Sequence, residues 1–141
     1  MKLITHDEKR SIYILRLDRG DELKETLAQF CTENKITAGY FSGIGSTDNC
    51  VLAYYDAQQK QYIDHTFIGH YEVISIHGNI SLIDENPLIH AHVVISGSDM
   101  TAKAGHVQSL MTYITNEIML QKLDGAITRK HSPEDNLFLI K

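Results

Sequence analysis

The stretch SIYILRLDRGDELKETLAQFCTEN, residues 11–34, sets the fold class of this chain. Its first part, residues 11–18, alternates in polarity and is rich in β-branched side chains, which predicts a strand. Gly20, Asp21 and Glu22 then form a helix-start signal with acidic residues in the first turn. The apolar residues that follow recur at helical spacing: Leu23, Leu27, Phe30 and Cys31. The stretch therefore predicts one amphipathic helix, at about residues 22–34, with one face packed on a sheet.

The rest of the chain is a series of strand-like segments with short connections. Residues 36–45 are expected to form a strand that ends in a tight turn at the glycines of GIGS, and residues 51–56 and 61–69 are expected to form a hairpin. Three further strands are predicted at residues 70–84, 88–96 and 137–141. Residues 107–120 fit either a helix face or a strand, and periodicity does not decide between them. Many strands and one clear helix predict an α+β fold: a mainly antiparallel sheet with one principal amphipathic helix packed on it. We expect residues 1–141 to form a single domain.

Size and composition set further expectations. A chain of 141 residues buries enough surface to fold without a disulfide or a metal, so a metal would be functional rather than structural. Cys31 and Cys50 belong to no CxxC pair and are expected to be buried thiols in a reducing compartment. The charged N-terminus has no signal-peptide pattern, and no stretch has the ~20 apolar residues that span a membrane. These features predict a cytoplasmic protein.

The charge balance is acidic. The formal net charge is −5, and the basic clusters, Lys9-Arg10 and Arg129-Lys130, have acidic residues around them. A protein that binds DNA directly normally presents a basic face, because phosphate contacts supply much of the affinity. Direct, tight DNA binding by this chain alone is therefore disfavoured.

Three histidines form the strongest candidate site. His90 and His92 lie two residues apart on a predicted strand, so their side chains project from the same face. We expect His106 to be delivered by the loop after this strand, with Gly105 allowing a tight backbone turn. Three neutral imidazoles and a water are a common ligand set for catalytic zinc. The spacing alone equally allows partly buried polar histidines without a metal.

Two carboxylates and one cation are further candidates. Glu72 shares a strand face with Ile74, so it either looks toward a packed face and binds a ligand or is an exposed edge charge. Glu117 raises the same question. Arg129 either pairs with one of these carboxylates or is a plain surface cation.

Six sequence elements, taken in order, resemble the PPC domain, the plant-and-prokaryote-conserved domain, over nearly the whole chain. The matching elements are SGIGSTDNCVLAYYD (42–56), GHYEVISIHGNI (69–80), HAHVVIS (90–96), AGHV (104–107), TNEIML (115–120) and TRKHSPEDNLFLI (128–140). The sequence departs from the family pattern at Ala104, where the family has glycine, and at Asn136, another glycine position. It carries no AT-hook, the basic element that accompanies the domain in plants.

The resemblance implies a homotrimer with a mainly antiparallel sheet, and a strand at residues 112–121. It also implies that His90, His92 and His106 hold a divalent metal, usually zinc. Bacterial members are often labelled predicted DNA-binding proteins, which suggests a role associated with DNA or transcription.

Two functions follow as hypotheses. The first is a trimeric binding or regulatory module that recognises a small molecule or a protein partner. The alternative is a zinc-dependent hydrolase of a small ester, lactone or phosphoester, in which a metal-bound water is the nucleophile. Glu72 or Glu117 would then be the general base, provided that it lies within hydrogen-bond reach of that water.

Overall fold

The computed structural model describes residues 1–141. Its regular elements are eight strands and one helix, joined by turns and loops. The strands are β1 (Lys2–Asp7), β2 (Ile12–Asp18), β3 (Gly39–Asp56), β4 (Gln61–Ile83), β5 (Asn86–Ser96), β6 (Ala102–Lys122), β7 (Arg129–Ser132) and β8 (Leu137–Ile140). Helix α1 (Leu23–Glu33) follows β2 and confirms the predicted helix to within one residue at each end. No helix of the structure combines the length and the apolar character that crossing a bilayer requires.

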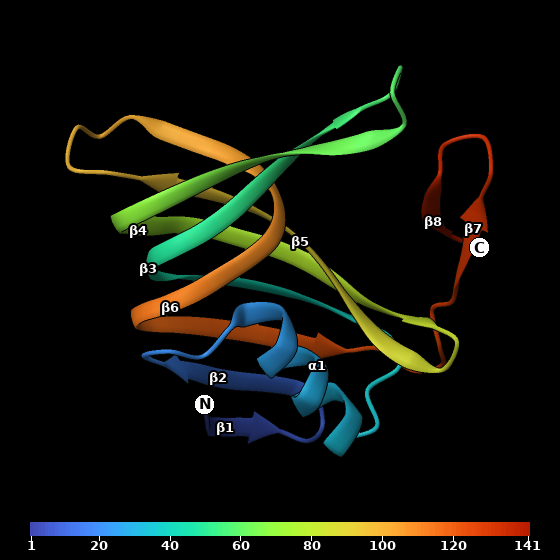
Figure 1. Cartoon of the computed structure of the whole chain (residues 1–141). Helices are drawn as coiled ribbons and strands as arrows, with labels where there is room; N and C mark the ends of the chain where they lie inside the picture. Colours follow the sequence, from blue (N-terminus) through green and yellow to red (C-terminus); the bar gives the residue numbers. More distant parts are fainter.

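Six strands form one curved sheet in the order β1-β2-β6-β3-β4-β5, and each pairing is antiparallel. The first residues of β6 also pair with β5, because β6 is long enough to serve two neighbours along its length. The orange β6 ribbon bends between these two parts (Figure 1). Strands β3, β4, β5 and β6 therefore close on one another. The predicted α+β fold, mainly antiparallel with a single helix, is confirmed.

Helix α1 packs against β5 and β6 through the residues that the sequence pattern selected (Figure 1). Leu23, Leu27, Phe30 and Cys31 are all buried. The Glu22 side chain caps the helix by accepting a hydrogen bond from the Glu25 amide at 2.7 Å. This apolar helix face is part of a core of 22 buried residues, most of which come from the sheet.

Both cysteines are free and buried, as predicted. Burial in apolar surroundings raises the pKa of Cys31 to about 12 and that of Cys50 to about 11. Neither thiol is therefore an available nucleophile at neutral pH.

The prediction of a tight turn at GIGS is wrong, because these residues continue through the middle of β3. The pairing of β3 with both neighbours shifts register near Gly43 and Gly45. A Cβ atom on Gly43 would lie 2.6 Å from the Glu117 carbonyl oxygen, and one on Gly45 would lie 2.2 Å from the Thr115 carbonyl oxygen. These glycines allow the close approach of β6 rather than a reversal of the chain.

The segment that periodicity left ambiguous is a strand. Residues 107–120 lie within β6, with Val107, Leu110 and Ile118 buried. This segment pairs with β3 along its length and with β2 from Thr115 onward, and these hydrogen bonds decide against a helix.

The last two strands form a small hairpin outside the main sheet, drawn in red in Figure 1. The predicted strand at residues 137–141 is β8, and its partner is β7. The hairpin is attached to β4 by the Arg129 side chain, whose Nε donates to the Ser81 hydroxyl at 2.8 Å.

We expect Gly78→Ala to destabilise the protein by about 1–3 kcal/mol, because overpacking forces side chains off their preferred rotamers. A Cβ atom at Gly78 would lie 2.3 Å from Cζ of the buried Phe41 and 2.5 Å from the His90 carbonyl oxygen. Urea unfolding of the two proteins measures the difference. Gly97→Ala is the matched control, since the nearest atom there is 3.3 Å away on the Tyr71 ring. Equal losses in the two variants would contradict this account of Gly78.

Candidate metal centre

The three histidines lie together on two paired strands. His90 and His92 lie on β5, alternating with the buried residues Ala91 and Val93. His106 lies on β6 directly opposite His92 in the antiparallel register. The prediction that a loop delivers His106 is therefore wrong: the connecting loop is residues 97–101, and the histidine follows on the strand. Gly105 is likewise in extended backbone rather than in a tight turn.

The imidazoles converge on one point. The distances between ring centroids are 5.3 Å for His90 and His92, 5.1 Å for His90 and His106, and 5.3 Å for His92 and His106. Each ring offers a nitrogen, and the three nitrogens lie within 4.8 Å of one another. Nitrogens bound tetrahedrally to one zinc ion would be about 3.4 Å apart. Small ring rotations therefore bring the three onto a common ion.

Burial keeps two of these imidazoles neutral. Loss of solvation lowers the pKa of His90 to about 4, and the Arg129 charge beside it adds to the effect. Loss of solvation also lowers the pKa of His106 to about 4, with smaller contributions from His90 and His92. A metal ion binds the neutral form of imidazole. At neutral pH these two ligands need to lose no proton before they bind.

One buried atom is left without a partner. Nδ1 of His106 is buried and makes no hydrogen bond, although polar atoms in protein interiors normally find one. The Tyr62 ring stacks on the same imidazole, with ring centroids 4.6 Å apart, and fixes its plane. The His106 imidazole, held in place beside the other two and with one nitrogen unsatisfied, fits a divalent ion.

Arg129 lies beside the histidines and not beside a carboxylate. Its guanidinium donates to the Ser81 hydroxyl at 2.8 Å, the Asn79 side-chain oxygen at 2.9 Å and the Phe138 carbonyl at 2.8 Å. Nη2 also lies 3.3 Å from Nδ1 of His90. The hypothesis that Arg129 pairs with Glu72 or Glu117 is wrong, because none of the partners of its guanidinium is a carboxylate and it takes part in no salt bridge.

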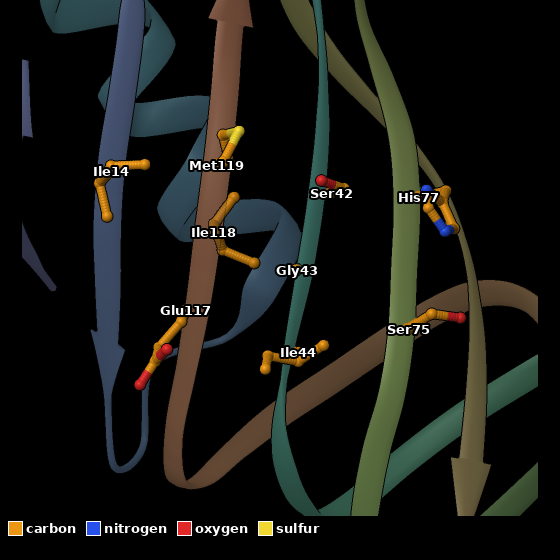
Figure 2. Close-up of a pocket in the computed structure, with 9 residues that line it drawn as sticks. All are labelled: Ile14, Ser42, Gly43, Ile44, Ser75, His77, Glu117, Ile118 and Met119. Atoms are coloured by element: carbon orange, nitrogen blue, oxygen red, sulfur yellow. The ribbon is translucent and has the colours of Figure 1, made fainter. Parts of the chain in front are cut away.

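The two candidate carboxylates lie elsewhere. The Glu72 side chain is 65% exposed and pairs with His70 at 3.3 Å. It is therefore an exposed charge, but it does not lie at a sheet edge, because β4 pairs with β3 and β5 at this residue. Glu117 lies on β6 in a shallow hollow of the sheet face (Figure 2), together with Ile14 and Met119. Neither carboxylate lines the cavity that His90 and His106 line. A general base from either residue at the histidine site is therefore not supported by this geometry.

A cavity of about 320 Å³ opens beside the histidines. Its polar lining comes from Lys24, Tyr62, His90, His106, Arg129 and Asn136, and its apolar lining from Ile83, Leu88, Ile89, Leu137, Phe138 and Leu139. The β7–β8 hairpin supplies one wall. Sequence reasoning missed Lys24 and Tyr62, because only the packing of α1 and of the β3–β4 hairpin brings them to the site.

The chain is similar to one protein family and to several solved structures. Residues 5–124 match the model of the Plants and Prokaryotes Conserved (PCC) domain. A plant- and prokaryote-conserved (PPC) protein from Pyrococcus horikoshii is 32% identical, with a TM-score of 0.86 over 90% of this chain and 89% of that one. A metal-containing protein from Archaeoglobus fulgidus is 30% identical, with a TM-score of 0.86 over 100% of this chain and 99% of that one.

Two further relatives carry other names. A protein from Bacteroides thetaiotaomicron named a "putative dna binding protein" is 27% identical, with a TM-score of 0.91 over 99% of this chain and 98% of that one. A bifunctional protein GlmU from Synechococcus sp. (strain JA-3-3Ab) is 26% identical over 125 residues, which is 86% of this chain. The chain spans 19% of the length of that curated relative.

The fold, the order of the motifs and the family match agree, and the chain belongs to the Plants and Prokaryotes Conserved domain family, also written PPC.

Proposed function

We propose that this protein is a metal-dependent binding module whose His90, His92 and His106 together hold one divalent ion, with zinc as the preferred ion. The observation that carries the proposal is the convergence of the three imidazoles, each of which offers a nitrogen within 4.8 Å of the other two. The Archaeoglobus fulgidus relative, named as metal-containing, supports the same conclusion. Zinc on three imidazoles keeps one position open for a ligand.

Binding is favoured over hydrolysis. A zinc hydrolase needs a general base within hydrogen-bond reach of the metal-bound water. The residues that line the cavity beside the histidines include no aspartate or glutamate. The open position is therefore better suited to holding a ligand than to activating water.

Direct DNA binding is not part of the proposal. The chain has 13 Lys and Arg residues against 18 Asp and Glu residues, and this net negative charge opposes the phosphate contacts that supply much of the affinity for DNA. The name of the Bacteroides relative describes that protein and does not outweigh this charge balance.

We also propose that the protein assembles as a homotrimer through the sheet face shown in Figure 2. This face exposes the large apolar side chains of Ile44 (57%) and Met119 (54%). Ile74 (54%) lines an adjoining hollow together with Ile44. A patch of this kind in a monomeric protein usually marks an interaction site. Association of copies through the face would remove these side chains from water.

Metal analysis tests the proposed site. Protein purified without chelator or nickel resin should bind close to one zinc ion per chain, and zinc should raise the melting temperature because it binds only the folded state. His106→Ala should remove most of both effects. His131→Ala is the matched control, since His131 is exposed and lies outside the three-histidine cluster. Less than about 0.2 zinc per chain in the wild type would overturn the proposal.

Light scattering tests the assembly. The wild type should have three times the chain mass of 16.0 kDa. Met119→Lys should shift the mass toward that of one chain, because a charge buried in an apolar contact is costly. Met100→Lys is the matched control, since Met100 is 85% exposed on the β5–β6 loop. A wild-type monomer, or a trimer that survives Met119→Lys unchanged, would refute the proposed contact.

A further inference from the structure

The cavity beside the histidines carries two cations without a carboxylate partner. Lys24 reaches it from α1 and donates to the Val107 and Gln108 carbonyls, each at 3.3 Å. Arg129 reaches it from β7, and its guanidinium is held by a hydroxyl, an amide oxygen and a carbonyl. Neither cation takes part in a salt bridge of the structure. In a chain with a net charge of −5, two uncompensated cations at one cavity favour an anionic ligand.

The walls of the same cavity are apolar. Ile83 and Leu88 line it from β4 and β5, and Leu137, Phe138 and Leu139 line it from β8. A mostly apolar lining with a few convergent polar groups is typical of a small-molecule site. The chemistry fits a small carboxylate that carries a short apolar group. The β8 wall lies beyond residues 5–124, so part of the apolar lining of the cavity falls outside the family match.

Metal binding and the Arg129 contact with His90 compete for the same imidazole. A neutral imidazole has one N–H donor and one lone pair, and a guanidinium only donates. In the contact at 3.3 Å, Nδ1 of His90 therefore accepts from Nη2 of Arg129. An ion that binds Nδ1 takes this lone pair, and an ion that binds Nε2 leaves the proton on Nδ1. In both cases His90 no longer accepts, and one Arg129 N–H is released beside the cavity.

From these contacts we infer that the cavity is a carboxylate site whose affinity is coupled to the metal site through Arg129. The inference rests on the proposed function, since it requires an ion on the three histidines. Lys24 and Arg129 attract the carboxylate, the released guanidinium N–H donates to it, and the apolar walls hold its tail. Because coupling is reciprocal, metal strengthens carboxylate binding and carboxylate strengthens metal binding by the same factor.

Calorimetry with hexanoate as the probe tests the coupling. We expect hexanoate to bind the zinc-loaded protein about 10-fold more tightly than the zinc-free protein, and zinc affinity to rise by the same factor with hexanoate present. Acetate, which lacks the tail, and 1-hexanol, which lacks the charge, should each bind more weakly than hexanoate.

Variants separate the parts of the inference. Arg129→Met should still bind zinc but lose most of the coupling between zinc binding and hexanoate binding. Lys130→Met is the matched control, because it makes the same charge change at the next, exposed position of β7, and it should behave as the wild type. If circular dichroism shows that Arg129→Met is unfolded, Lys24→Met replaces it and should weaken hexanoate binding about 10-fold.

Three outcomes are informative. No zinc binding by the wild type overturns the proposed function. Zinc binding without hexanoate binding, or with hexanoate binding that zinc does not change, overturns this inference alone. Unchanged coupling in Arg129→Met removes Arg129 as the link.

Discussion

The antiparallel register between β5 and β6 is the constraint on which the site depends. This register sets His106 opposite His92, and strand alternation sets His90 beside them. Side chains on a strand alternate between two faces, so a slip of one residue would exchange the imidazoles for the buried Val93 and Val107. The energy that keeps the register is therefore apolar burial on the opposite face, and packing of the core places the three histidines.

The charged side chains at the cavity are opposite in sign to the net charge of the chain. The chain as a whole has a net charge of −5, whereas the cavity beside the histidines is lined by Lys24 and Arg129 and by no carboxylate. Burial that lowers the pKa of His90 and His106 removes any further positive charge from the imidazoles at neutral pH. A bound divalent ion would thus be the largest charge in the cavity, flanked by two side-chain cations. That arrangement suits an anion far better than a neutral or cationic ligand.

The apolar sheet face and the histidine cluster belong to one row of paired residues. Met119, Ser42, His77, His92 and His106 occupy successive partner positions across the sheet. Directly paired residues in an antiparallel sheet project from the same face. A copy of the chain bound at the face in Figure 2 would therefore lie next to the exposed His92. The proposed assembly and the proposed metal site are neighbours on one surface.

Local patterns in the sequence predict local structure here, and long-range pairing accounts for what they miss. Helix α1, the β3–β4 hairpin and the side-by-side projection of His90 and His92 follow from alternation and capping signals. The turn at GIGS and the loop position of His106 were wrong, because Gly43 and His106 owe their conformations to β6 and β5 across the sheet. The place of Arg129 beside His90 depends on how the terminal hairpin packs, which no local signal encodes.

The most direct measurement is anomalous diffraction from crystals grown with zinc, recorded on either side of the zinc absorption edge. The account predicts one strong peak per chain, within about 2.0–2.1 Å of a nitrogen of each of His90, His92 and His106. Absence of a peak at this point, or a peak bound by surface carboxylates instead, would contradict it.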